Sequence, residues 1–271
     1  MSFTRFNNAE GQASGTTVTV ANSGGQSGYA VDSVSGGAAL TFDNSQFFAG
    51  AQSYKMVTSS TTAYFTWNVP GGGTTYVSWP SIYSRFYVQW LTSAFTNAGL
   101  YFLQCTGSAS SVYVTSGKLV AAIGATTTSG VTALAGGTWY RVEVQSNFSN
   151  STPSTVIRLY DASGTLLETI TATGSAISSK VPATVYLGSA GGSTTGTMWI
   201  DQPAISDQGW IGTATSLPIS KANNSAGGTN GVTVSIVNSG GASGDAFDYV
   251  TTSPSGNVLA GTIRRTSHNT K

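Results

Sequence analysis

The 271 residues of this chain include only 8% charged residues, with a formal net charge of +1, against 39% hydrophobic and 11% aromatic residues. A net charge this close to zero gives no long-range attraction to nucleic acid, and no apolar run is long enough to span a bilayer. A single cysteine excludes an intrachain disulfide. We therefore expect no nucleic-acid partner and no membrane span, and the N-terminus shows no signal peptide.

Short strands separated by glycine- or serine-rich turns are predicted along the whole chain, without helical periodicity. In chain order they cover residues 16–22, 61–69, 81–91, 99–105, 111–115, 118–123, 138–146, 154–161, 165–172, 183–190 and 196–206. About eleven strands at even spacing predict an all-β fold, a two-sheet antiparallel jelly-roll sandwich. Asp161–Gly164 is predicted to form a tight hairpin turn, because Asp bonds its own downstream backbone and Gly supplies a positive φ.

Alternation within these strands predicts one face that enters the core and one that points outward. At 82–90, apolar residues at even positions alternate with Tyr, Arg and Gln, and 140–145 and 156–160 repeat the pattern. Outward aromatics and planar cations suit a sugar, which stacks on rings and bonds through its hydroxyls. The predicted ligand-binding residues are Tyr83, Arg85, Tyr87, Arg141, Arg158 and Tyr160. The alternative is that they cover a solvated sheet or pack against a neighbouring subunit.

A repeat defines the predicted domains. Residues 7–34 align without gaps to residues 223–250, and roughly half of the positions are identical. We therefore predict a jelly roll at 1–209, a linker at 210–222 and the truncated start of a second copy at 223–271. The tail at 261–271 departs from the first copy and is interpreted as an out-of-frame or frameshifted end. A partial sandwich leaves strand edges unpaired, which favours pairing with a neighbouring module.

Five stretches carry a resemblance to a known family: NNAEGQASGTTVTVANSGGQSG, SRFYVQW, TWYRVEV, VIRLYDASG and MWIDQPAISDQGWIG. In this order, over nearly all of residues 1–212, the sequence resembles the laminin-G-like, concanavalin A-like jelly-roll modules of actinobacterial proteins and their phages, including minor tail and capsid decoration proteins. The resemblance implies glycan binding, adhesion or virion decoration, and in some members glycoside cleavage.

Calcium is a cofactor that jelly rolls of this kind often bind, through oxygen ligands from the first and last strands. The candidate ligands here are Asp32, Asp43 and Asp201. The alternative is that Asp32 and Asp43 accept backbone N–H groups in turns.

Catalysis has little support in the residues. A glycosidase needs two carboxylates facing one groove, and of Glu10, Glu143 and Glu168 only Glu143 lies in a strongly patterned strand, beside Arg141. Such a pair indicates a cross-strand ion pair rather than an acid catalyst. The only histidine is His268, in the aberrant tail. We therefore predict that the chain is not an enzyme; a glycoside hydrolase would need a second carboxylate near Glu143.

The function expected from these observations is that of a non-enzymatic phage virion protein, a capsid decoration or minor tail protein that also adheres to glycans. Its expected partners are other virion proteins, further copies of itself and a cell-surface glycan, and its expected location is the virion. The alternative is a carbohydrate-binding module of a bacterial cell-surface or secreted protein.

Overall fold

The computed structural model describes residues 3–24, 28–59, 62–70, 81–91, 98–105, 108–149, 151–175, 182–189 and 195–214. The chain divides into two units, Met1–Thr213 and Ala214–Lys271. The predicted second copy at 223–271, with its tail at 261–271, lies outside the described residues, as does the predicted linker after residue 214. These domain boundaries stay predictions. In the part of the chain that the structure describes, no helix is both long and apolar enough to cross a membrane.

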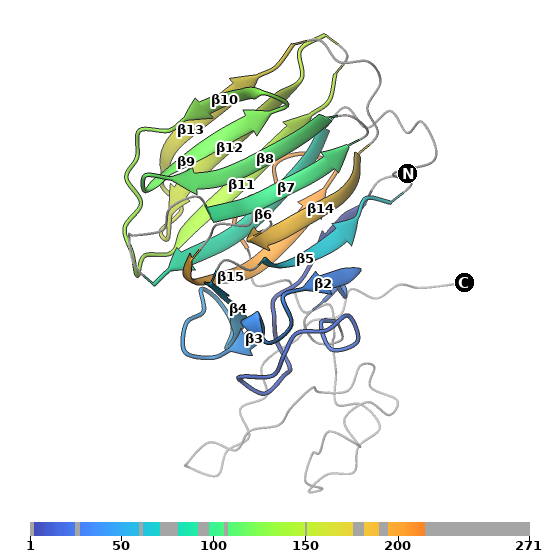
Figure 1. Cartoon of the computed structure of the whole chain (residues 1–271), viewed down its shortest axis with the longest axis vertical. Helices are drawn as coiled ribbons and strands as arrows, with labels where there is room; N and C mark the ends of the chain where they lie inside the picture. The colour runs from blue at the N-terminus through green and yellow to red at the C-terminus, as the bar shows by residue number, and fades with distance from the viewer. Residues whose placement is uncertain are drawn as a thin grey trace, which may run out of the picture. The chain divides into compact units, whose positions relative to one another are not determined.

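Two antiparallel sheets form the fold, which confirms the predicted all-β sandwich (Figure 1). The eight-stranded sheet has the order β13-β12-β11-β6-β15-β4-β3, and β1 pairs with β15. Its strands are β1 (Thr4–Phe6), β3 (Leu40–Asp43), β4 (Ser53–Ser59), β6 (Ser81–Trp90), β11 (Tyr140–Asn147), β12 (Ser154–Asp161), β13 (Leu166–Thr173) and β15 (Thr195–Ser206).

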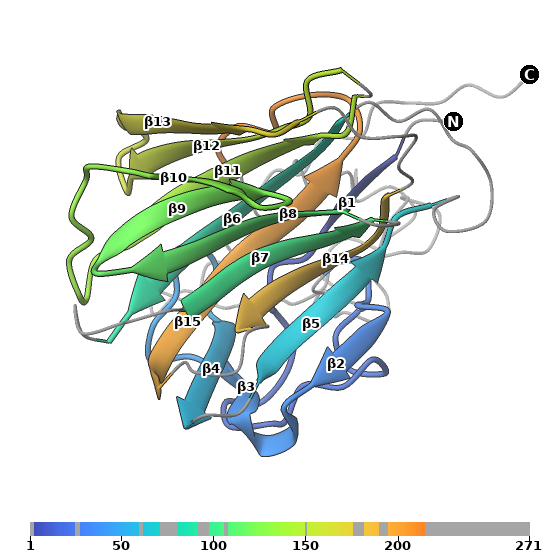
Figure 2. The same ribbon diagram turned by 45° about the horizontal axis from the view of Figure 1, so that its top comes forward.

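The seven-stranded sheet has the order β10-β9-β8-β7-β14-β5-β2, and Figure 2 shows it as one layer in front of the other sheet. Its strands are β2 (Ser33–Ser35), β5 (Ala63–Asn68), β7 (Ala98–Cys105), β8 (Ser108–Thr115), β9 (Lys118–Ile123), β10 (Thr126–Ser129) and β14 (Pro182–Ser189). Strands distant in sequence are therefore neighbours, since β14 pairs with both β5 and β7.

The core between the sheets follows the predicted alternation. On β6, Ile82, Phe86 and Val88 are fully buried in the core, and Phe65 and Trp67 enter it from β5. The hairpin at Asp161 is also confirmed: its carbonyl oxygen accepts the N–H of Gly164, which has a φ of 91°.

A line of buried hydroxyls crosses the core from one sheet to the other. Tyr101 Oη lies 2.9 Å from Ser146 Oγ, and Ser110 Oγ lies 2.6 Å from both Ser146 Oγ and Thr155 Oγ1. Thr155 Oγ1 donates to the carbonyl oxygen of Ala122 at 2.7 Å. These bonds pair polar groups that would otherwise cost free energy in an apolar interior.

The strand predicted at 16–22 is wrong. Thr17 makes only an isolated bridge with Thr41, and the following residues form a turn. The Asn22 side chain closes this turn, because its Oδ1 accepts the Thr19 N–H at 2.7 Å and its Nδ2 donates to the Thr17 carbonyl at 2.9 Å. Asparagine side chains that bond nearby backbone in this way compete with strand pairing.

The repeated N-terminal segment, residues 7–34, is fixed to the sandwich by Asn7, which is 1% exposed. Asn7 Oδ1 accepts the N–H of Ala9 and the hydroxyl of Tyr54 on β4. Asn7 Nδ2 donates to the carbonyls of Ser23 and Tyr29. One side chain thus joins two turns of the segment to the eight-stranded sheet.

Candidate functional site

All six predicted ligand-binding residues lie together on adjacent strands, on the face of the eight-stranded sheet that points away from the core. Cross-strand pairing places Arg85, Glu143 and Arg158 in one row across β6, β11 and β12. The next row contains Tyr87, Arg141 and Tyr160. The sequence prediction therefore identified a true spatial cluster, although Glu143, which lies at its centre, was not in the predicted set.

Two segments cover this cluster. The strap, defined as residues 207–213, places Trp210 with its ring centroid 3.9 Å from the Arg158 guanidinium and 5.5 Å from the ring of Tyr83. The loop before β4 stacks Phe48 on Tyr87, with centroids 3.8 Å apart and an interplanar angle of 15°.

The exposed surface available to a ligand on this face is consequently small. Arg85, Tyr87 and Arg141 are only 6%, 2% and 5% exposed. Tyr83, Arg158 and Tyr160 are half-buried. The strand β6 was expected to carry its odd-numbered side chains outward into solvent; instead both faces are buried from Ser84 to Trp90. Ligand binding by the six residues stays a prediction, with access limited to these last three side chains.

Glu143 forms an ion pair with one of the three arginines of the cluster. Arg141 Nε lies 3.2 Å from Glu143 Oε1, and the Arg141 guanidinium lies 3.8 Å from the Tyr160 ring centroid. Burial raises the pKa of Glu143, against the lowering effect of Arg141 and Arg85. Arg85 donates to the carbonyl oxygens of Gln202 and Gly212, the second of which belongs to the strap. These contacts hold the strap against the sheet.

The three candidate calcium ligands each bind donors of the protein. Asp32 Oδ2 accepts the Asn68 N–H at 2.6 Å, and Asp43 Oδ2 accepts Trp199 Nε1–H at 2.6 Å. Asp201 Oδ2 accepts two backbone N–H groups of the loop before β4, at 2.8 and 2.9 Å. Among the residues that the structure describes, no group of three or more His, Cys, Asp or Glu side chains is placed to hold a metal ion.

A second candidate site lies on the outer face of the seven-stranded sheet, and sequence reasoning did not find it. The rings of Tyr64 on β5 and Phe102 on β7 flank Tyr186 on β14, the strand between them. Their centroids lie 5.3 and 5.5 Å from that of Tyr186, with interplanar angles of 64° and 70°. All three rings are half-buried rather than covered. Edge-to-face packing therefore fixes a group of partly exposed rings on this face.

Amide and hydroxyl groups border these rings. Tyr186 Oη donates to Gln104 Oε1 at 2.9 Å, and Thr184 Oγ1 donates to Asn68 Oδ1 at 3.2 Å. We call this surface the aromatic patch, and it consists of Tyr64, Asn68, Phe102, Gln104, Thr184 and Tyr186. Both amide side chains belong to exposed residues.

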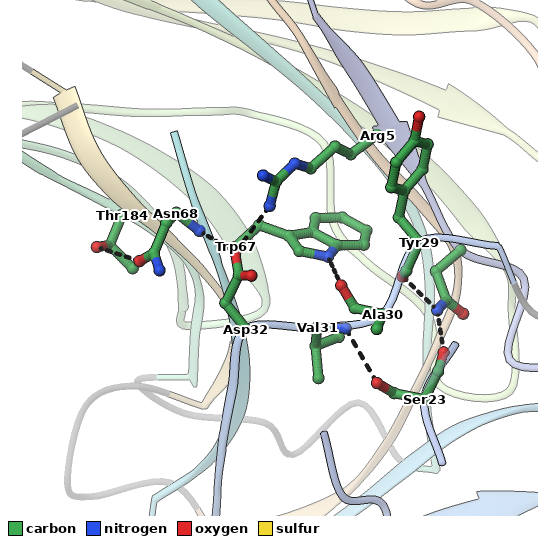
Figure 3. Close-up of polar contacts among 10 residues, drawn as sticks. Arg5, Ser23, Tyr29, Ala30, Val31, Asp32, Trp67, Asn68 and Thr184 are labelled. Carbon is green, nitrogen blue, oxygen red and sulfur yellow. Dashed lines mark hydrogen bonds and ion pairs between the residues drawn. The ribbon is translucent and has the colours of Figure 1, made fainter. Parts of the chain in front are cut away.

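The repeated N-terminal segment supports one edge of the aromatic patch (Figure 3). Asp32 accepts the backbone N–H of Asn68 and pairs with Arg5, whose Nη1 lies 2.8 Å from Asp32 Oδ2. Trp67 Nε1 donates to the Ala30 carbonyl at 2.9 Å. Figure 3 shows this ion pair beside Asn68, with Thr184 on the other side of the amide.

One signal in the sequence points to the aromatic patch. Strand alternation puts Tyr64 and Asn68 opposite the core residues of β5, and Tyr186 opposite Val185 and Leu187 of β14. The signal was insufficient because β5 and β14 are distant in sequence, and only their pairing in the sheet brings the rings together.

Comparisons with known proteins place the chain in no family. No family model matches it, and no curated protein matches it. Among solved structures, it is similar to Trypanosoma rangeli sialidase, with 11% identity, a TM-score of 0.46, and coverage of 75% of this chain and 30% of that one.

Two further similar structures are binding domains of botulinum neurotoxin DC. The domain in complex with rat synaptotagmin II has 13% identity, a TM-score of 0.42 and coverage of 76% of this chain and 43% of the other. The domain in complex with SialylT has 14% identity, a TM-score of 0.43 and coverage of 67% and 44%. The chain thus spans less than half the length of these three structures, and similarity at this level assigns it neither ligand nor activity.

Proposed function

We propose that this chain is a non-enzymatic adhesion protein that binds glycans through the aromatic patch. The observation that supports this proposal is the ring cluster of Tyr64, Phe102 and Tyr186 on an outer sheet face. A sugar buries its apolar ring face on an aromatic ring, while amides bind its hydroxyls. Both chemistries occur side by side here.

The surroundings of the glutamates favour binding over catalysis. Glu10 Oε1 accepts the Ala51 N–H at 2.7 Å, and Glu168 accepts the N–H groups of Val131 and Thr132. Glu143 is paired with Arg141 under the strap. A glycosidase holds two carboxylates on either side of a sugar, whereas here Glu10 and Glu168 accept backbone N–H groups and Glu143 forms an ion pair within the fold.

The setting that we propose is a phage virion, with the chain as a capsid decoration or minor tail protein. The module repeat and the resemblance to phage jelly rolls support this assignment, and the expected partners are further copies of the chain and other virion proteins. A carbohydrate-binding module of a bacterial cell-surface or secreted protein would use the same site in another setting. Mass spectrometry of purified virions decides between them: absence of the chain from the particles refutes the virion assignment.

Glycan binding itself is tested by a glycan array followed by calorimetry on two tyrosine variants. Tyr186→Ala removes the central ring of the aromatic patch, and we expect at least a tenfold loss of affinity, about 1.4 kcal/mol. Tyr160→Ala is the matched control, because it removes a half-buried tyrosine from the outer face of the other sheet. Loss of binding in the Tyr160 variant alone would move the site to the six residues predicted from the sequence.

A further inference from the structure

The seven-stranded sheet carries almost no charge. Its four adjacent strands β5, β14, β7 and β8 contain no Asp, Glu, Lys, Arg or His, and Lys118 on β9 is the only charged residue in all seven strands. The eight-stranded sheet, in contrast, carries Arg85, Arg141, Glu143 and Arg158 on three neighbouring strands. The charges of the sandwich are therefore concentrated on one side.

The charged side chains at the edge of the aromatic patch neutralise each other. Arg5 and Asp32 form an ion pair of 2.8 Å beside Asn68, and Asp32 also accepts the Asn68 backbone N–H. An anionic ligand on the rings would therefore meet no uncompensated cation among the described residues of the patch and its edge. Removing a carboxylate from water without such a partner is costly.

The two amide side chains of the aromatic patch retain hydrogen-bond donors for a ligand. Gln104 Oε1 and Asn68 Oδ1 are already occupied as acceptors, by the hydroxyls of Tyr186 and Thr184. Each amide group also has two N–H donors, and both residues are exposed. A ligand that presents acceptor oxygens can therefore bind to both amides.

Sheet register fixes the spacing of these donors. Thr184 pairs with Asn68 on one side and with Gln104 on the other, so the two amides lie two strands apart, at about 10 Å. The next row of the patch is formed by Tyr186 and Phe102, which are also directly paired. A row of rings thus runs parallel to a row of donors, across the strands.

We infer that the aromatic patch selects uncharged oligosaccharides and discriminates against acidic ones, such as sialylated glycans. This inference rests on the proposed function. Stacking on Tyr186 and Phe102 supplies apolar contact, while Asn68 and Gln104 donate to ring, hydroxyl or acetamido carbonyl oxygens of successive sugar units. No step of recognition requires a charge on the ligand.

The test compares one glycan in two charge states: N-acetyllactosamine chains from the array and the same chains capped with sialic acid, with uncharged glucose and mannose oligosaccharides as further probes. Calorimetry is run at 50 and 500 mM NaCl. We expect an uncharged oligosaccharide to bind with an affinity that changes less than twofold with salt, because no ion pair is formed. We expect its sialylated form to bind more weakly.

Gln104→Glu is the decisive variant. The new carboxylate can still accept the Tyr186 hydroxyl, so the internal bond persists, but the N–H donors are lost and a negative charge is added. We expect at least a tenfold loss of affinity for the uncharged glycan. Gln145→Glu is the matched control on the outer face of the other sheet, where Gln145 Nε2 donates to Tyr83 Oη, and it should bind as the original chain does.

The outcomes distinguish the inferred selectivity for uncharged glycans from the proposed function of glycan binding. A sialylated glycan that binds as tightly as its uncharged form or more tightly, with affinity lost in Tyr186→Ala, would overturn the inference and leave glycan binding at the patch intact. Binding to uncharged glycans that Gln104→Glu does not weaken would also overturn it. Absence of any glycan binding that depends on Tyr186 would refute the proposed function itself.

Discussion

Replacing Asn7 by alanine tests how the repeated N-terminal segment is joined to the sandwich. The Asn7 side chain is buried, and its Oδ1 accepts the Ala9 N–H at 2.8 Å and the Tyr54 hydroxyl at 2.6 Å. Asn7→Ala removes that acceptor from two buried donors. It also deprives the carbonyls of Ser23 and Tyr29 of their shared amide donor.

The expected cost follows from the two donors. Leaving a buried polar group unpaired costs about 1–3 kcal/mol, so the loss for the Ala9 N–H and the Tyr54 hydroxyl together is about 4 kcal/mol. For a domain of this size, 1 kcal/mol corresponds to a change in melting temperature of about 2–4 °C. We therefore expect Asn7→Ala to lower the melting temperature by about 10 °C.

Differential scanning calorimetry and urea denaturation of the full chain measure this effect. The matched control is Asn22→Ala, which removes an asparagine from an exposed turn, where its Oδ1 accepts the Thr19 N–H. That change should cost about 1 kcal/mol. A loss in Asn7→Ala no larger than that of the control would refute the assignment of Asn7 as the joint between segment and sheet.

Three further predictions concern the sheet face under the strap and the N-terminal segment. Burial raises the pKa of Asp201 to about 7, so between about pH 4 and pH 7 the folded chain retains a proton that the unfolded chain has released. The free energy of unfolding contributed by this group should fall as the pH rises through that window. Asp201→Asn should reduce the difference in unfolding free energy between pH 5 and pH 8, measured by urea denaturation. An unchanged difference would contradict the raised pKa of Asp201. Trp210→Ala should cost about 1–2 kcal/mol and speed hydrogen exchange in the strap, because it removes the ring stacked on Arg158, and unchanged exchange would show that this contact does not hold the strap. Gly28→Ala should lower the melting temperature more than Gly15→Ala does, although both residues have a positive φ. The reason is that a Cβ at residue 28 would lie 2.6 Å from a carbonyl oxygen, whereas one at residue 15 would meet nothing within 4 Å. Equal losses in melting temperature would exclude this steric explanation.

The fold was predictable because its determinants are local. Alternation on β6 identified the core face at Ile82, Phe86 and Val88, and the Asp161 turn was readable from its own residues. The strand predicted at 16–22 failed for an equally local reason, the competition of the Asn22 side chain for backbone groups. Alternation of apolar and polar residues indicates strand propensity, but it does not indicate whether a side chain will bind nearby backbone groups instead.

The candidate sites were harder to predict because distant segments create or cover them. Tyr87 reads as an outward residue of β6, yet Phe48 stacks on it from another loop. Tyr64 and Tyr186 read as isolated outward tyrosines, and only the pairing of β5 with β14 makes them neighbours. Tertiary contacts decide whether a residue on a sheet face is exposed, and the alternation of residues within one strand does not predict those contacts.

The hydroxyl line through the core has only one possible proton order. The Thr155 hydroxyl donates its proton to the Ala122 carbonyl, so Ser110 must donate to Thr155. By the same argument Ser146 donates to Ser110, and Tyr101 donates to Ser146. The hydroxyls at the two ends of this line therefore contribute unequally to stability. Loss of the Tyr101 hydroxyl leaves a lone pair of Ser146 unused, whereas loss of the Thr155 hydroxyl leaves the Ser110 proton without its acceptor and removes a donor from the Ala122 carbonyl oxygen. The sandwich is therefore expected to depend more on Thr155 than on the Tyr101 hydroxyl.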